Sequence, residues 1–124
     1  MATAHALHSP DPALVLAKAV LNAASRLGLG SRQLGRVLGC SEATVSRLRS
    51  GKGLDPASKE GQLATLIIRA YRSLNAIVGG SDEQSQAWFH AQHHELGGVP
   101  AERIANVEGL VDVVQYLDAM RARI

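Results

Sequence analysis

The chain has 124 residues, of which 46% are apolar and 19% charged, a balance typical of one folded domain. This composition excludes wholesale disorder, and no apolar run approaches the roughly 20 residues that a membrane-spanning helix needs. The single cysteine, Cys40, excludes an internal disulfide and a multi-cysteine metal site. We therefore expect a cytoplasmic protein that needs no cofactor and does not contact a membrane.

Positive charge is concentrated in one part of the sequence. The formal net charge is only +2, but residues 1–60 carry +4 and residues 61–124 carry −2. Within residues 31–52, five basic side chains accompany a single acid, Glu42. A local excess of this kind predicts a contact with nucleic acid that only part of the chain makes. Four aromatic residues are too few for a surface that stacks single-stranded bases, so double-stranded DNA is the expected partner.

Apolar residues spaced three and four apart, interrupted by glycine and proline, predict an all-α fold without strands. Residues 1–12 are expected to form a flexible leader. Ser31, Ser41 and Ser81 are expected to cap helices, and Asp55 followed by Pro56 is a typical start for a long helix. With their caps, the predicted helical segments cover residues 13–27, 31–38, 41–50, 55–78, 81–95, 100–105 and 107–121.

The segment from 31 to 51 has the pattern of a helix-turn-helix. Two short helices meet at Gly39, and Gly35 is small enough to let them approach closely. In such a motif the second helix lies in the DNA major groove with its first residues at the base edges. The candidate DNA-binding residues are Ser31, Arg32, Ser41, Glu42, Ala43, Thr44, Ser46, Arg47 and Arg49.

Each of these side chains suits a particular DNA contact. Arg47 is expected to bind a base or a phosphate, with Thr44 and Ser46 donating hydrogen bonds nearby. Ser31 is expected to fix the first helix on the DNA backbone. The alternative is a plain helical hairpin whose basic face is only solvated.

Two patterns together resemble a known family. Residues 31–51, with Leu-Gly-Cys-Ser at the turn and Thr-Val-Ser-Arg after it, resemble an Xre-type (Cro/repressor-like) module. Further on, Ala87-Trp88-Phe89, then Leu96-Gly97-Gly98-Val99-Pro100, then Glu108-Gly109-Leu110 are similar to the toxin-binding domain of Xre/MbcA/ParS antitoxins. Members of that family are usually encoded beside a RES-domain toxin that destroys NAD.

The resemblance implies a domain organisation and a function. It implies a DNA-binding region at 13–54, a connecting and dimerisation helix at 55–80 and a small helical toxin-binding domain at 81–124. The protein would be a type II antitoxin that neutralises a RES-domain toxin and represses its own promoter. Because the chain stops soon after its last helix, we expect the whole domain to cover the toxin sterically. The alternative is a stand-alone regulator whose C-terminal domain only dimerises.

Candidate partner-binding residues follow from the same reasoning. The candidate toxin-binding residues are Trp88, Asp118, Arg121, Arg123 and Ile124. Trp88 is expected to pack in the core, and the alternative is that it anchors an interface. A small helix-turn-helix needs paired half-sites, so a homodimer is expected. The long helix has more apolar positions than one partner face needs, which suggests an interface at Ile67, Tyr71 and Leu74.

Three nearby histidines and the single cysteine are the candidates for a metal site and a redox site. His90 and His94 are four residues apart on a predicted helix, but no third metal ligand accompanies them. We therefore expect no metal, and an enzyme such as a metal-dependent hydrolase is the least favoured alternative. Cys40 falls where an apolar residue of the turn normally packs, so burial is expected rather than redox chemistry.

Overall fold

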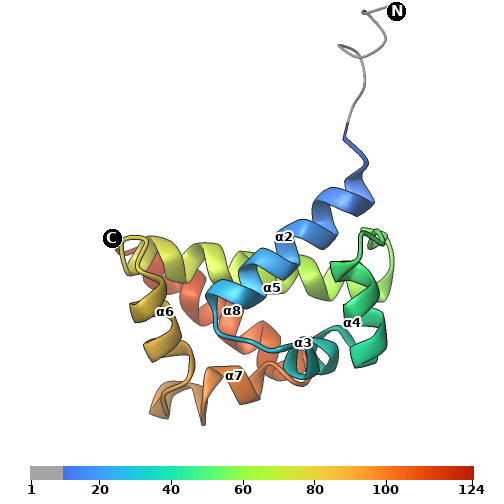
Figure 1. Ribbon diagram of the computed structural model, residues 1–124. Helices are drawn as coiled ribbons and strands as arrows, with labels where there is room; N and C mark the ends of the chain where they lie inside the picture. The colour runs from blue at the N-terminus through green and yellow to red at the C-terminus, as the bar shows by residue number, and fades with distance from the viewer. Residues whose placement is uncertain (1–9) are drawn as a thin grey trace, which may run out of the picture.

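The computed structural model describes residues 10–124 (Figure 1). Within this range the chain is all-α, as predicted, and its nearest approach to a sheet is an isolated bridge between His93 and Gly98. None of the helices described combines the length and the apolar content that crossing a membrane requires. The elements are α2 (Pro12–Arg26), α3 (Ser31–Leu38), α4 (Glu42–Arg49), α5 (Lys59–Ile77), α6 (Asp82–Phe89), the short 3-10 helix η1 (His94–Leu96), α7 (Pro100–Arg103) and α8 (Val107–Arg121).

Side-chain caps fix most of the helix starts. The Ser41 and Ser81 hydroxyls each accept a backbone N–H three residues ahead at 3.1 Å, so both predicted caps are confirmed. Ser31 is not a cap, because Gly30 holds that position and its N–H donates to the Gln33 side chain at 3.2 Å. At the N-terminus Asp11 caps α2, so the predicted leader ends at Pro10, and its residues 1–9 lie outside the described residues.

The long helix starts later than the sequence predicted. Asp55 does accept an N–H, from Ala57 at 2.9 Å, but this closes a turn rather than a helix. Ser58 is the actual N-cap of α5 and accepts from Gly61 N at 3.0 Å. A Cβ atom at Gly61 would overlap the Asp55 carbonyl oxygen, so the turn folds directly onto the first turn of α5. Of two capping signals three residues apart, the second therefore starts the helix.

Helix α6 is shorter than predicted. It ends at Phe89, not near residue 95, because the following chain folds into a tight loop. His93 and Gly98 exchange backbone hydrogen bonds of 2.9 and 3.2 Å, with Gly97 in the left-handed conformation between them. His90 and His94 therefore do not lie on one face of a helix, and the prediction that they lie one helical turn apart is wrong.

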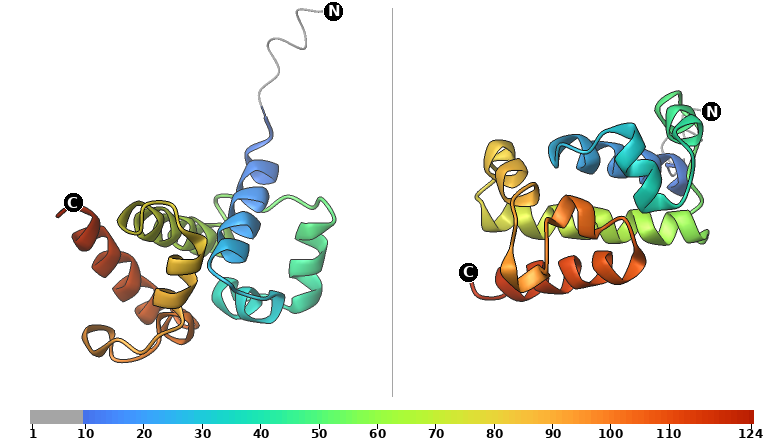
Figure 2. Two further views of the ribbon diagram at one scale, coloured as in Figure 1. Left: turned by 60° about the vertical axis from the view of Figure 1, so that its left-hand side comes forward. Right: turned by 90° about the horizontal axis from the view of Figure 1, so that it is seen from below.

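Helix α5 lies at the centre of the molecule. It packs against α8 on one side and against α2 on the other, and it also touches α3 (Figures 1 and 2). The apolar side chains of all these helices form one continuous core. Phe89, the largest fully buried side chain, ties α6 into it.

The central position of α5 removes two of the three residues that were expected at the dimer interface. Ile67 and Leu74 are 0% and 1% exposed, so they are core residues of a single chain and cannot contact a second copy. Tyr71 is half-buried, and its hydroxyl accepts a hydrogen bond from the Asn75 side chain at 3.3 Å. The surplus of apolar positions on α5 reflects two intramolecular partners rather than an intermolecular one.

The close approach of α7 and α8 leaves no room for a side chain at Gly109, which a substitution can test. A Cβ atom there would overlap the Arg103 carbonyl oxygen, so Gly109→Ala should destabilise the fold by about 1–3 kcal/mol despite alanine's higher helix propensity. Urea unfolding followed by circular dichroism measures the change. The exposed Gln115→Ala on the same helix is the control and should stay within about 0.5 kcal/mol of the parent. An unchanged midpoint for Gly109→Ala would contradict the packing described.

Candidate functional site

Helices α3 and α4 form a tight helix-turn-helix. Gly39 ends α3 in the left-handed conformation, with a φ of 72°. A Cβ atom at Gly35 would lie 2.8 Å from the Cys40 carbonyl oxygen, which confirms that a small residue is needed where the turn crosses α3. Five apolar residues of the two helices are buried and anchor them on the core: Leu34, Val37, Leu38, Val45 and Leu48.

A chain of polar contacts runs along the first turn of α4. The Ser41 hydroxyl caps the helix and lies 3.1 Å from the Thr44 hydroxyl. Thr44 in turn accepts a hydrogen bond from Arg47 Nη2 at 3.1 Å. The guanidinium of Arg47 is thereby held along the helix, and within residues 10–124 its other donors have no side-chain partner, which suits a phosphate or a guanine edge.

A second contact joins the start of α3 to the end of α4. Arg49 Nε donates to the Ser31 hydroxyl at 3.2 Å, so Ser31 links the two helices rather than capping one. Eight of the nine predicted DNA-binding residues lie within α3 or α4. The ninth, Ser41, is the N-cap of α4, so all nine belong to the helix-turn-helix. Arg36 and Lys52 are also exposed and add to the positive charge of the segment, although the helix-turn-helix pattern alone did not select them.

Cys40 lies in the turn between these helices and is partly buried. Burial raises the pKa of its thiol, and the negative charge of Glu60 raises it further. The thiol is therefore held in its protonated, weakly nucleophilic form at neutral pH. This agrees with a packing role for Cys40.

The loop after α6 builds a small aromatic cluster. Trp88 stacks on His93, with ring centroids 4.4 Å apart, and on Tyr116 of α8, 6.1 Å away. His93 Nε2 also lies 2.8 Å from the Trp88 carbonyl oxygen. Trp88 is thus packed against two rings yet only half-buried, so one part of the indole remains at the surface.

The other toxin-binding candidates do not lie with Trp88. Asp118 is on the opposite side of α8 from Tyr116, where it accepts a hydrogen bond from Ser73 at 2.9 Å and pairs with Arg69. Arg121 lines the same side, and Arg123 and Ile124 are exposed beyond it, with Ile124 76% exposed. The predicted residues therefore fall into two groups on different faces.

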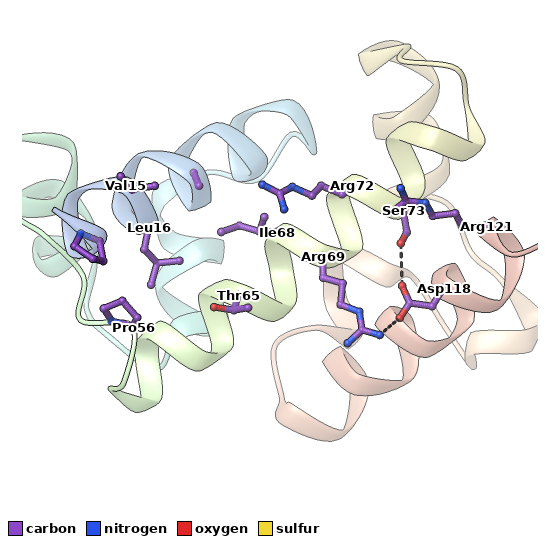
Figure 3. A pocket seen from close by; sticks show the side chains of 12 residues that line it. Val15, Leu16, Pro56, Thr65, Ile68, Arg69, Arg72, Ser73, Asp118 and Arg121 are labelled. Atoms are coloured by element: carbon purple, nitrogen blue, oxygen red, sulfur yellow. Dashed lines mark hydrogen bonds and ion pairs between the residues drawn. The ribbon is translucent and has the colours of Figure 1, made fainter. Parts of the chain in front are cut away.

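A groove of about 600 Å³ runs between α2, α5 and the end of α8 (Figure 3). Its end near α2 is apolar and includes Val15, Leu16 and Ile68 (Figure 3). Arg72 and Arg121 lie toward its other end. No local sequence pattern predicts this groove, because it assembles from helices that are far apart in the chain.

The histidines take structural positions. His90 Nε2 lies 2.9 Å from the Leu27 carbonyl oxygen at the end of α2. No group of three potential metal ligands occurs among residues 10–124. His90 instead belongs to a clamp in which α6 grips the last turn of α2: Asp82 pairs with Arg26 at 2.9 Å, and Gln86 donates to the Arg26 carbonyl at 3.2 Å.

Comparison with known families matches both halves of this structure. Residues 6–69 match the antitoxin Xre-like helix-turn-helix domain. The chain belongs to this antitoxin family. Residues 73–123 match the C-terminal toxin-binding domain of the Xre/MbcA/ParS antitoxins. No curated protein matches the chain. The Xre-like antitoxin thus combines a DNA-binding module with a toxin-binding domain, and both rest on α5.

The environment of Cys40 in this antitoxin can be probed by alkylation. Because burial and Glu60 raise the thiol pKa, the folded protein should react with iodoacetamide at pH 8 more slowly than free cysteine does. Glu60→Gln should speed the reaction, and unfolding in urea should bring the rate to that of free cysteine. Reaction of the folded protein at the rate of free cysteine would contradict the packed turn.

Proposed function

We propose that this antitoxin neutralises a RES-domain, NAD-degrading toxin and represses its own promoter as a homodimer. The observation that carries the proposal is the exposed cationic face of α3 and α4 in the same chain as the toxin-binding domain. The RES toxin as partner comes from the family resemblance, and residues 73–123 support a toxin partner in general. The division into regions 13–54, 55–80 and 81–124 is part of the same proposal, with α5 as the shared support.

In this proposal α4 enters the major groove of operator DNA. Its exposed side chains present a hydroxyl at Ser46, a methyl at Ala43, a carboxylate at Glu42 and a guanidinium at Arg47. These groups can contact base edges by hydrogen bonds and by apolar contact with a thymine methyl. Arg49, Ser31 and Arg32 lie where they can hold the phosphate backbone and fix the orientation of α4.

In the same proposal the toxin docks on the C-terminal part of the chain. The exposed Arg121, Arg123 and Ile124 offer two forked cations and an apolar contact close together. Trp88 supplies a rigid aromatic edge on the neighbouring face. Asp118 is already paired with Arg69, so it acts by positioning the groove rather than as a free acid.

A double substitution tests DNA binding. Arg47→Ala with Arg49→Ala should weaken binding to the antitoxin's own promoter by about 2–6 kcal/mol in total and flatten the salt dependence of binding. Fluorescence anisotropy with promoter DNA at two salt concentrations measures both effects. Arg123→Ala removes one charge outside the motif and should leave affinity nearly unchanged. Promoter affinity that survives the double substitution would show that α4 does not bind DNA.

A charge reversal tests toxin docking. Arg121→Glu with Arg123→Glu should weaken binding of the adjacent RES-domain toxin at least about tenfold, because two exposed cations become anions. Growth rescue in co-expression and calorimetry with the purified toxin give the readouts. The matched control, Arg32→Glu with Arg36→Glu, reverses two charges on α3 and should leave rescue intact. Full rescue by the Arg121, Arg123 variant would remove these residues from the proposed toxin interface.

A further inference from the structure

Helix α2 carries a stripe of side chains that residues 10–124 leave exposed. Asp11, Leu14, Val15 and Lys18 follow the spacing of residues on one face of a helix, and all four are exposed. Leu14 and Val15 are 43% and 52% exposed, two of only four large apolar side chains that residues 10–124 leave in solvent. Neither Asp11 nor Lys18 forms a salt bridge within that range. An apolar pair thus lies between an acid and a base that form no ion pair within residues 10–124.

Two grooves adjoin this stripe. Val15 lines the groove of about 600 Å³, whose apolar end it shares with Leu16 and Ile68 (Figure 3). Val15 also lines a second groove of about 390 Å³, which includes Leu48 in the last turn of α4 and Lys52 in the segment that follows. All four stripe residues line the second groove, and only Val15 lines both, so the stripe forms one wall of the second groove with Val15 between the two grooves.

We propose that the α2 stripe is the homodimer interface, formed by antiparallel pairing of α2 with α2 of a second copy. In a two-fold arrangement centred between residues 14 and 15, Asp11 of each copy faces Lys18 of the other, and Leu14 faces Val15. Every charge then meets its opposite and every apolar side chain meets an apolar one. Such self-complementarity is what an isologous interface requires and what an unrelated partner does not.

The position of the stripe also fits DNA binding. Because Leu48 in the last turn of α4 and Lys52 beyond it line the second groove, pairing through α2 turns the C-terminal ends of the two α4 helices toward the two-fold axis. Two recognition helices related in this way can reach successive half-sites on one side of the duplex. The inference rests on the homodimer of the proposed function and moves its interface from α5 to α2.

A substitution in the stripe tests the interface. Val15→Asp places a charge where the two copies meet, and because of the two-fold symmetry each copy contributes one such charge to the interface. We expect the dimer dissociation constant to rise by about 100-fold or more, measured by sedimentation equilibrium of the full chain. Val107→Asp is the matched control, since Val107 is 58% exposed on α8 and away from the stripe. It should leave the dimer intact, and thermal unfolding should show both variants folded.

A charge exchange tests the antiparallel register. Asp11→Lys and Lys18→Glu each place like charges opposite one another, so each variant alone should be monomeric. An equimolar mixture restores both pairs and should form a heterodimer. Asp11→Lys also removes the α2 cap, but a chain that failed to fold for that reason would not be rescued by its partner. Absence of heterodimer in the mixture would overturn the register.

The possible outcomes separate this inference from the proposed function. A dimeric Val15→Asp protein overturns the α2 interface but leaves the homodimer standing. A parent chain that is monomeric at about 100 μM, where specific dimers of even modest affinity assemble, overturns both. A Val15→Asp protein that stays dimeric but no longer binds the RES-domain toxin overturns the inference by assigning the stripe to the toxin.

Discussion

The burial of α5 on two opposite sides is the constraint on which the rest of the structure depends. Ile67, Ala70 and Leu74 are shielded from solvent by α8 and α2 together. Burial of an aliphatic side chain contributes about 1.5–3 kcal/mol, so removing either partner helix would expose several such contributions at once. The DNA-binding module and the toxin-binding domain therefore share one hydrophobic core. Each is stabilised by a helix that also stabilises the other.

The clamp between α2 and α6 reinforces this dependence at the surface. The last carbonyl groups of a helix lack partners within it, and α6 supplies them to α2 through Gln86 and His90. Gly28, with a φ of 74°, lets the chain turn away beneath these side chains. A toxin that displaced α6 would therefore loosen the end of α2 and, through α2, the packing of α4. The clamp therefore couples the position of α6 to the end of α2.

Much of the fold could be predicted from the sequence because its signals are local. The serine caps at 41 and 81 and the glycine at 39 act within one turn of the chain, and the structure confirms their roles. The errors arose where a distant contact or a competing local signal decides the outcome. Two caps competed before α5, and the bridge from His93 to Gly98 shortened α6. Of the candidate site, the helix-turn-helix residues lie together as predicted, since one contiguous segment of 21 residues contains them.

The surfaces that the sequence missed have a common physical cause. A helix with apolar residues on two sides can bury them against one chain or against two, and spacing alone does not distinguish these cases. On α5 both sides are satisfied internally, whereas α2 keeps two adjacent apolar residues in water between an acid and a base. The informative signal is thus the apolar position left over after the intramolecular core is complete. Only the assembled core shows which positions those are, and among residues 10–124 the two that lie side by side are on α2.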